Sequence, residues 1–320
     1  MKGNISYARQ STSRADARAV ARVVRSSHLA MGPMKDALEH ELRSTTGASF
    51  AVAVSSGTAA LHAAYAALGV GPGDEVIVPA ITFASTATTV VHRGGVVKFA
   101  DVDPVSGLID VESVKNLLSD RTKAVVAVDY AGRPAEIQPI LDIVRPLGIK
   151  LVADAAHSLG SSLNGVPVGS LADVTCLSLF ATKNVAAGEG GGVVTNSSHL
   201  AEKAREFASH GIKRAPAEQA GESWDPWVYD INVLGLNYRP SELQAALAVS
   251  QIKRLGKFQI RRQKIFDRYV SELAGIEELS LPVTPEKADI VWHLFPIRVD
   301  ASIRRDLFTF LHQRGIIVQV

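Results

Sequence analysis

The stretch Leu177-Ser-Leu-Phe-Ala-Thr-Lys183-Asn-Val-Ala-Ala-Gly188-Glu-Gly-Gly-Gly192 decides how the rest of the sequence is interpreted. A β-like apolar run leads into Lys183, and the glycine cluster behind it lets backbone segments pack closely. Upstream, Lys150-Leu-Val-Ala-Asp154-Ala-Ala-His157 is a second apolar run that ends on a carboxylate. The sequence therefore predicts a lysine amine and an acid at the ends of two buried strands.

These two groups are the pair that a pyridoxal 5'-phosphate (PLP) site requires. A lysine amine can bond covalently to the cofactor, and an acid can keep a proton on the pyridine nitrogen so that the ring withdraws electrons. Taken alone, the pairing is a weak signal, because most lysines beside glycine turns are solvated surface residues. The other segments of the chain have to decide between the two interpretations.

Composition narrows the class of protein and its partners. The chain has 320 residues, 47% hydrophobic and 21% charged, as in ordinary globular proteins. Its 34 basic and 32 acidic residues leave a net charge of +2, so nothing directs it to nucleic acid or an anionic membrane. Cys176 is the only cysteine, which rules out an internal disulfide. No long apolar stretch or signal-peptide core is present, so we expect a cytoplasmic protein.

Extended and helical patterns alternate between about residues 50 and 210. The expected strands are short, apolar at consecutive positions and rich in Val, Ile and Leu, as in strands covered on both faces. They span 75–79, 96–101, 124–130, 150–154, 173–179 and 192–196, and the expected helices span 58–68, 85–92, 111–118, 137–147 and 199–209. This alternation predicts an α/β fold with a mostly parallel sheet between helices.

The pattern changes after residue 210. Residues 212–230 are polar and have no clear period, which predicts a long loop. Ser241 is expected to cap a helix that runs to residue 252, and further on we expect a strand at 293–299, a helix at 302–313 and a strand at 316–320. We therefore expect a large cofactor-binding domain over 1–240, with an N-terminal helical segment, and a smaller α/β domain over 241–320 that is incomplete.

Small and hydroxyl side chains stand where a strand gives way to a helix, in Ser55-Ser-Gly57-Thr58. The free N–H groups and positive dipole end of a helix N-terminus bind phosphate, and glycine permits close backbone approach. Ser178, five residues before Lys183, could return to the same phosphate. A plain helix cap explains the Ser and Thr residues equally well.

Other ligand-binding residues are expected at neighbouring strand ends, where ligands bind in parallel sheets. Phe83 follows the strand at 75–79 and could stack on a flat ring, although a lone phenylalanine is more often part of a core. His157 could meet the phenolic oxygen of PLP, or it could be a bystander. No metal-ligand spacing, serine-hydrolase elbow or phosphate-binding nucleotide loop occurs in the sequence, so we expect no metal site.

Taken in order, these segments resemble the DegT/DnrJ/StrS-type nucleotide-sugar aminotransferases, which are PLP-dependent enzymes of aminotransferase fold type I. The matching stretches follow the family's order over nearly the whole chain: Ser55-Ser-Gly-Thr-Ala-Ala-Leu61, 71–83, Asp154-Ala-Ala-His157, 178–184, 188–191 and Gly235-Leu-Asn-Tyr-Arg239. Residues 7–11 and 128–132 are most similar to the C4 aminotransferases of the pseudaminic-acid pathway.

The resemblance implies catalytic and ring-binding roles for four residues. Lys183 would hold the cofactor covalently and later move a proton between Cα and C4′. Asp154 would pair with the pyridine nitrogen, and Phe83 would stack on the ring. His157 would lie near the phenolic oxygen.

The resemblance also implies a shared phosphate site. Gly57, Thr58 and Ser178 would hold the phosphate, and Asn237 or Arg239 would complete it across the interface between two subunits. A homodimer would then be the functional unit.

The implied reaction moves the amino group of glutamate to PLP and then to a keto group of a nucleotide-linked deoxysugar. A sugar dehydratase on the same scaffold typically replaces the lysine by histidine, whereas this chain carries Lys183. A cyclitol or aminobenzoate-type relative and a non-catalytic PLP- or sugar-binding regulator remain alternatives. Two departures from the family concern the sugar side: Phe180-Ala181 stands where many members have His-Pro, and the sequence stops at Val320, where members usually continue.

Overall fold

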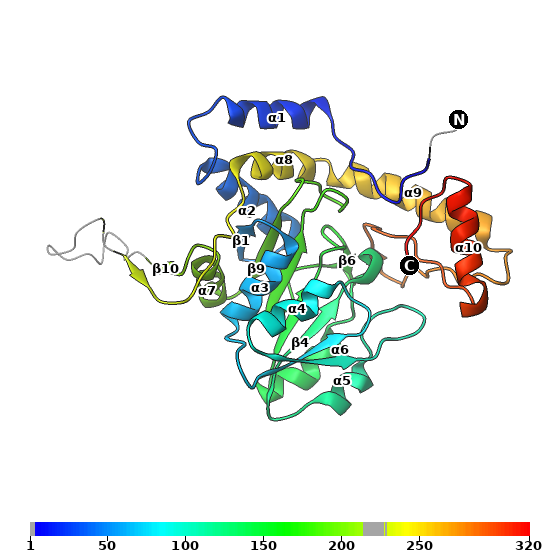
Figure 1. Cartoon of the computed structure of the whole chain (residues 1–320), viewed down its shortest axis with the longest axis horizontal. Coiled ribbons are helices and arrows are strands. Elements are labelled where there is room, and N and C mark those ends of the chain that lie inside the picture. Colours follow the sequence, from blue (N-terminus) through cyan, green and yellow to red (C-terminus); the bar gives the residue numbers. More distant parts are fainter. Residues whose placement is uncertain (1–3, 214–226, 228) are drawn as a thin grey trace.

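A seven-stranded sheet forms the centre of the protein in the computed structural model, which describes residues 4–213, 227 and 229–320 (Figure 1). Across the sheet the order is β1 (Phe50–Val54), β9 (Gly191–Thr195), β8 (Val174–Ser178), β5 (Lys150–Asp154), β4 (Thr122–Val128), β2 (Glu75–Pro79) and β3 (Val96–Ala100). The five strands from β8 to β3 are parallel to their neighbours, and β9 is antiparallel to both β8 and β1. The expected mostly parallel α/β sheet is confirmed, and β1 is a strand that the predicted ranges did not include.

Helices cover both faces of the sheet, which explains why its central strands are apolar at consecutive positions. One face packs against α3 (Gly57–Ala67), α4 (Ala84–His92) and α7 (Ser198–Phe207). The opposite face packs against α5 (Val111–Leu117) and α6 (Gln138–Val144) at one end, and against α2 (Pro33–Thr46) and α8 (Glu242–Ile252) at the other. The five helices predicted between residues 58 and 209 are therefore present, with ends shifted by a few residues.

Helix α3 lies close against the sheet because its buried face is built from alanines. Ala60, Ala63 and Ala64 are fully buried against the strands. Small side chains let the helix backbone approach the strands, so the N-terminus of α3 reaches the carboxyl edge of the sheet next to β8. This placement positions the phosphate-binding candidates described below.

The N-terminal and C-terminal parts of the chain pack together. Helix α1 (Arg14–Val24) lies along α8, and α2 packs between α8 and the sheet (Figure 1). Ser241 caps α8 as expected, with its side chain accepting from the backbone N–H of Gln244. Helix α9 (Leu255–Leu273) then leads away toward the C-terminal residues.

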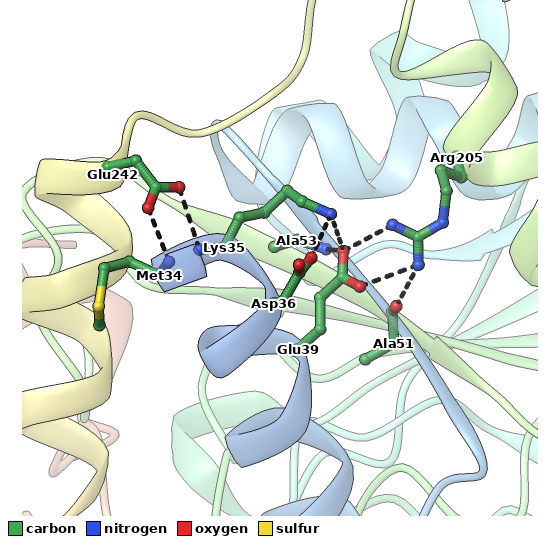
Figure 2. Close-up of polar contacts among 8 residues, drawn as sticks. All are labelled: Met34, Lys35, Asp36, Glu39, Ala51, Ala53, Arg205 and Glu242. Atoms are coloured by element: carbon green, nitrogen blue, oxygen red, sulfur yellow. Dashed lines mark hydrogen bonds and ion pairs between the residues drawn. The ribbon is translucent and has the colours of Figure 1, made fainter. Parts of the chain in front are cut away.

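A charged cluster fixes α2 to its neighbours, and we call it the α2 junction: Lys35, Glu39, Arg205 and Glu242 (Figure 2). The Arg205 guanidinium donates to both oxygens of the Glu39 carboxylate at 2.8 and 2.9 Å. The same guanidinium donates to the carbonyl of Ala51, and Glu39 also accepts from the N–H of Ala53 at 3.1 Å. These contacts hold α2 and α7 to strand β1.

The second half of the α2 junction is a cap supplied from another helix. Glu242, at the start of α8, accepts from the backbone N–H of Met34 at 2.6 Å and of Lys35 at 3.1 Å (Figure 2). The residue before α2, Gly32, offers no side-chain cap of its own. The carboxylate therefore satisfies two free N–H groups and the positive dipole end of α2.

Beyond α9 the chain returns to the sheet-bearing part. Strand β12 (Ala288–Asp289) pairs with β6 (Ser162–Leu163), which pairs with β7 (Val166–Pro167). Helix α10 (Ala301–Gln313) confirms the helix predicted at 302–313. The division at residue 240 stays a prediction.

Two predicted strands near the C-terminus are wrong. Residues 293–299 contribute one isolated bridge, Arg298 to Ser280, and residues 316–320 contribute one, Ile316 to Ile5. Pro296 interrupts the first segment and cannot donate to a strand ladder. Phe295 of the first segment packs against Phe266 of α9 with ring centroids 5.3 Å apart, so it contributes to packing without forming a regular strand.

The long loop predicted at 212–230 falls largely on residues 214–226 and 228, which lie outside the described residues. At its base, β10 (Ile212–Lys213) pairs with β11 (Asp230–Ile231). Within the part of the chain that the structure describes, no helix is long and apolar enough to cross a membrane.

Candidate active site

The carboxyl edge of the parallel sheet gathers most of the predicted site residues. Strands β5 and β8 are parallel neighbours, so Asp154 at the end of β5 lies next to the end of β8, which leads to Ser178 and Lys183. We call the cluster formed by Gly57, Asp154, His157, Ser178 and Lys183 the lysine site. Its members come from the ends of β5 and β8 and from the start of α3.

Asp154 is buried and its carboxylate is held by two hydrogen bonds. One oxygen accepts from the Thr86 hydroxyl at 2.7 Å, and the other accepts from the backbone N–H of Ala156 at 3.2 Å. The Thr86 hydroxyl in turn accepts from that of Thr82 at 2.7 Å. Burial raises the pKa of Asp154, while these bonds and the nearby Lys183 oppose the rise. The carboxylate is therefore held in one orientation and is shielded from water, so a cation beside it would be bound strongly.

Lys183 lies in the turn between β8 and β9. This turn is closed by backbone bonds from Leu179 to Gly190 at 2.8 Å and from Ala181 to Gly188 at 2.9 Å, and Gly188 adopts φ +82°. Burial lowers the pKa of Lys183, and the Asp154 carboxylate partly offsets that effect. Among the described residues Lys183 has no ion-pair partner within 4.0 Å. The amine is therefore biased toward its neutral, nucleophilic form.

The glycine cluster after Lys183 brings β9 against the start of α3. A Cβ on Gly191 would lie only 2.3 Å from the carbonyl oxygen of Ser56, and a Cβ on Gly57 would lie 2.9 Å from the Cβ of Ser178. Side chains at these two glycines would push the helix N-terminus away from the lysine site. The close approach explains why this sequence places glycine on both sides of the contact.

The start of α3 combines a helix cap with a candidate phosphate cradle. Ser56 is the cap, and its hydroxyl accepts from the N–H of Ala59 at 3.1 Å. Thr58 is exposed and Gly57 lies directly against Ser178. The capping and phosphate-binding interpretations are thus compatible, because Ser56 caps the helix while Gly57, Thr58 and Ser178 remain at its open end.

Phe83 stands apart from the hydrophobic core. It precedes α4 just beyond β2, and 74% of its surface is exposed. The core interpretation of this residue is therefore wrong. Its exposed ring is compatible with stacking on a flat ligand, which stays a prediction.

His157 contacts a residue that the sequence interpretation missed. The ring of His157 packs against that of His293, with ring centroids 4.4 Å apart and planes inclined by 40°. Burial lowers the pKa of His157 to about 3, and the Lys183 charge acts in the same direction. Sequence reasoning assigned His293 to a predicted strand, and no motif at that position pointed to the lysine site.

The segment 237–239 lies beside the start of α3 in the same chain. The backbone N–H of Ser55 donates to the carbonyl of Tyr238 at 2.7 Å, while the Tyr238 hydroxyl is 3.0 Å from His62 on α3. Asn237 is exposed and Arg239 is half-buried. The contact between Ser55 and Tyr238 brings Asn237 and Arg239 to the same end of α3 as Gly57.

The residues present fit PLP as a cofactor. Lys183 is half-buried and has no ion pair among the described residues, and it matches the aldehyde of the cofactor. The buried Asp154 carboxylate on the neighbouring strand end matches the ring nitrogen, and the open N-terminus of α3 against Ser178 matches the phosphate.

Comparison with known proteins agrees with this geometry. The model of the DegT/DnrJ/EryC1/StrS aminotransferase family matches residues 10–320. The spore coat polysaccharide biosynthesis protein SpsC of Bacillus subtilis is 38% identical over 281 residues, which are 88% of this chain and 72% of SpsC.

Solved structures of sugar aminotransferases share the fold. The PLP form of the putative sugar aminotransferase Spr1654 from Streptococcus pneumoniae superposes with a TM-score of 0.91 at 27% identity, covering 99% of this chain and 84% of that one. Helicobacter pylori PseC, an aminotransferase involved in the biosynthesis of pseudoaminic acid, superposes with a TM-score of 0.92 at 29% identity, covering 99% and 84%. The predicted family, the aminotransferase fold and PLP as cofactor are confirmed.

Proposed function

The chain belongs to the DegT/DnrJ/EryC1/StrS aminotransferase family, and on that premise we propose that it moves an amino group from glutamate to a keto group of a nucleotide-linked deoxysugar. The observation that carries the proposal is the meeting of Lys183, Asp154 and the N-terminus of α3 at one edge of the sheet. SpsC and PseC support the sugar side, since both act in the biosynthesis of sugar-derived products according to their names.

Lys183 has the central role in this proposal. Bound in this site, PLP supplies an electron-withdrawing ring that stabilises negative charge on the carbon being deprotonated. Burial lowers the pKa of Lys183, so its neutral amine can bond to the cofactor and, once released, accept and return a proton.

Asp154 supports that chemistry by holding a charge where the cofactor ring nitrogen would lie. Its hydrogen bonds from Thr86 and Ala156 keep the carboxylate in one orientation. A protonated ring nitrogen would compensate the cost of ionising Asp154 in its buried position. We further infer that Phe83 stacks on the ring and that His157 lies near the phenolic oxygen.

The phosphate is held, in this proposal, by Gly57, Thr58 and Ser178, and Asn237 or Arg239 of a second copy completes the site. A homodimer is supported by exposed apolar side chains close to that segment. They include Trp227, Ile231 and Leu234, with 73%, 64% and 92% of their surfaces exposed. Such a concentration of exposed apolar surface is typical of an interface between chains.

The first experiment tests cofactor attachment and the amino donor. Purified protein with PLP should show a visible absorption band, and borohydride should fix the label on Lys183. In a separate sample that has not been reduced, glutamate should replace that band by the absorbance of pyridoxamine phosphate. The Lys150→Ala variant is the matched control, because Lys150 is a half-exposed lysine at the opposite end of β5. A label elsewhere, or no response to glutamate, would contradict the proposal.

A second experiment identifies the acceptor. The pyridoxamine-loaded protein is offered UDP- and dTDP-linked 4-keto and 3-keto sugars, and return of the visible band reports amino transfer. At least one nucleotide-linked keto sugar should react far faster than the free sugar. Reaction with a cyclitol ketone alone would overturn the assignment of the acceptor.

A third experiment tests the shared site. Chains with Lys183→Ala and chains with Arg239→Ala carry different affinity tags and are expressed together. Each variant by itself should be inactive or impaired. If Arg239 acts across the dimer, the mixed dimer has one intact site and recovers up to half of wild-type activity per dimer. If Arg239 serves its own chain, mixed dimers show no recovery. The pair Lys183→Ala and Asn237→Ala tests the other candidate in the same way.

A further inference from the structure

A pair of half-buried imidazoles with buried Nδ1 atoms lies close to the turn that carries Lys183. His157 follows β5, whereas His293 belongs to the segment that follows β12, and their ring centroids are 4.4 Å apart. No hydrogen bond joins the two side chains in the described structure, so the contact is ring against ring. The side chain of Asn184, the residue after Lys183, donates to the His157 carbonyl at 2.8 Å, which places the pair within the lysine site.

The backbone around His293 is tied to the ends of the central strands. The N–H of His293 donates to the carbonyl of Ala131 at 2.8 Å, just after the end of β4. At Gly132, which has φ +101°, a Cβ would lie 2.6 Å from the Val291 carbonyl and 2.9 Å from the His293 nitrogen. Only glycine accommodates both this φ and this crowding, so the backbone of residues 290–293 packs in one position against Gly132.

Asn184, the residue after Lys183, joins the same three parts of the chain. Its side-chain amide donates to the carbonyl of His157 at 2.8 Å and to that of Val291 at 2.9 Å. The Ser161 hydroxyl adds a further link, since it accepts from the N–H of Val291 at 2.9 Å. The turn that carries Lys183, the loop that carries His157 and the segment 290–293 are therefore held as one unit.

Both imidazoles are neutral at physiological pH. Burial lowers the pKa of His157 to about 3 and that of His293 to about 2, with the charges of His157, Lys183 and Arg262 adding to the effect on His293. The Nδ1 atoms of both rings are buried and have no hydrogen-bond partner in the described residues. No polar contact from the protein to Nδ1 therefore orients the His157 ring, and the packed ring of His293 can do so.

We propose that His293 is a positioning residue of the lysine site, which packs on His157 and holds that imidazole in one orientation beside Lys183. The proposal rests on the proposed role of His157 next to the cofactor, and it makes the segment 290–293 part of the active site. It predicts that the shape of the ring at position 293 matters, and that its nitrogen atoms do not.

Two variants separate shape from chemistry. His293→Phe keeps a flat ring, and His293→Ala removes it. The matched control is His312→Ala, because His312 also packs on an aromatic ring, Phe308 at 4.1 Å, but on helix α10 outside the lysine site. Thermal unfolding without cofactor shows which variants are folded.

The first readout needs no cofactor. Imidazole resonances of ¹⁵N-histidine-labelled protein, with His157 assigned from a His157→Gln variant, report the pKa and tautomer of His157. In His293→Ala, water reaches the His157 ring and its pKa should rise toward the usual value of about 6.5. In His293→Phe and His312→Ala the His157 signals should keep wild-type pH dependence. Unchanged His157 signals in His293→Ala would overturn the proposal, whether or not the protein binds PLP.

The second readout uses the PLP-loaded protein. Loss of positioning should lower kcat about 10- to 100-fold in His293→Ala, with a smaller effect on KM, because misplacement of a reacting group acts mainly on the chemical step. His293→Phe should recover kcat to within about threefold of wild type. Equal damage in the two variants would show instead that the imidazole of His293 acts directly, against the proposal. Failure of the wild type to attach PLP at Lys183 would count against the proposed function and leave the NMR test intact.

Discussion

The α2 junction and the lysine site both bury charged groups, but they treat them in opposite ways. At the α2 junction the Glu39 carboxylate has Arg205, Lys35 and a backbone N–H as partners (Figure 2). Within the lysine site, as far as the structure describes the chain, Lys183 has no ion pair and the Nδ1 atom of His157 has no hydrogen-bond partner. The charged groups of the α2 junction find their partners within the chain, whereas groups of the lysine site remain available to bind a ligand.

This difference in pairing indicates that the α2 junction serves the stability of the fold and that the lysine site serves its function. A buried polar group without a partner costs roughly 1–3 kcal/mol, so such groups persist mainly where they serve a ligand or a reaction. The Glu39–Arg205 pair is costly to break from the arginine side, because Glu39 is buried and would lose its main partner, whereas the Arg205 side chain is 44% exposed. Substitutions at the α2 junction should therefore affect folding, and substitutions within the lysine site should affect activity.

The largest expected effect is on activity at Lys183. Lys183→Met keeps the unbranched side chain but removes the amine, so amino transfer should fall by at least about 10³-fold, since the covalent attachment and the proton transfer are both lost. The free energy of unfolding without cofactor should stay within about 0.5 kcal/mol of wild type or rise. Initial rates and urea unfolding measure the two quantities, and a stability loss above about 2 kcal/mol would break the contrast.

The next effect is on folding at Glu39. Glu39→Ala leaves the buried Ala53 N–H and the half-exposed Arg205 guanidinium without their acceptor, which should lower the free energy of unfolding by about 2 kcal/mol. Glu39→Gln retains an acceptor and should lose less. The matched control is Asp36→Ala, an exposed carboxylate that also pairs with Lys35, with an expected change below about 0.5 kcal/mol. Equal losses at Glu39 and Asp36 would contradict the interpretation that burial of the Glu39 carboxylate causes the loss.

A third prediction concerns acid stability and the imidazole pair. The folded-state pKa of His293, about 2, lies below the value of about 6.5 for an unfolded imidazole, so below pH 6.5 the unfolded chain binds a proton that the folded chain does not. The wild type should therefore lose stability as pH falls, relative to His293→Phe, by about 2 kcal/mol between pH 7 and pH 5. Urea unfolding of both proteins at several pH values tests this, and parallel curves would refute it.

The smallest effect is expected at the interhelix cap. Glu242→Ala leaves the N–H groups of Met34 and Lys35 without an acceptor and should cost about 1–2 kcal/mol of unfolding free energy. The control is Glu112→Ala, an exposed first-turn acid of α5, which should change stability by less than about 0.5 kcal/mol. Activity per folded molecule should be unchanged in both variants. A specific loss of activity in Glu242→Ala would contradict the assignment of the α2 junction to stability alone.

Much of the lysine site could be predicted because it depends on local pattern and chain direction. Apolar runs that end on Asp154 and Ser178 identify buried parallel strands, and the carboxyl ends of such strands meet at one edge. Gly57 and Gly191 were visible in the sequence, but their shared reason, the close contact between α3 and the ends of β8 and β9, became visible only in three dimensions.

The contributions from outside the βα units could not be predicted. His293 and Asn184 act through contacts between segments far apart in the chain, and neither is marked by periodicity or spacing. The strand predicted at 293–299 was wrong for a related reason: a short apolar run has the same pattern whether it pairs in a sheet or packs irregularly, and Pro296 favours the latter.

The sequence by itself determined the α/β sheet, the strand end that carries Asp154, the glycine-rich segment that carries Lys183, and the resemblance that the family comparison confirmed. These features follow from side-chain order along the chain and from the fixed direction of parallel strands. Only the tertiary structure decided which charges are paired, that His293 packs on His157, and that Glu242 caps α2. The physical reason is that the burial of a side chain and its hydrogen-bond partners depend on which distant segments come into contact, and these contacts cannot be read from a local sequence pattern.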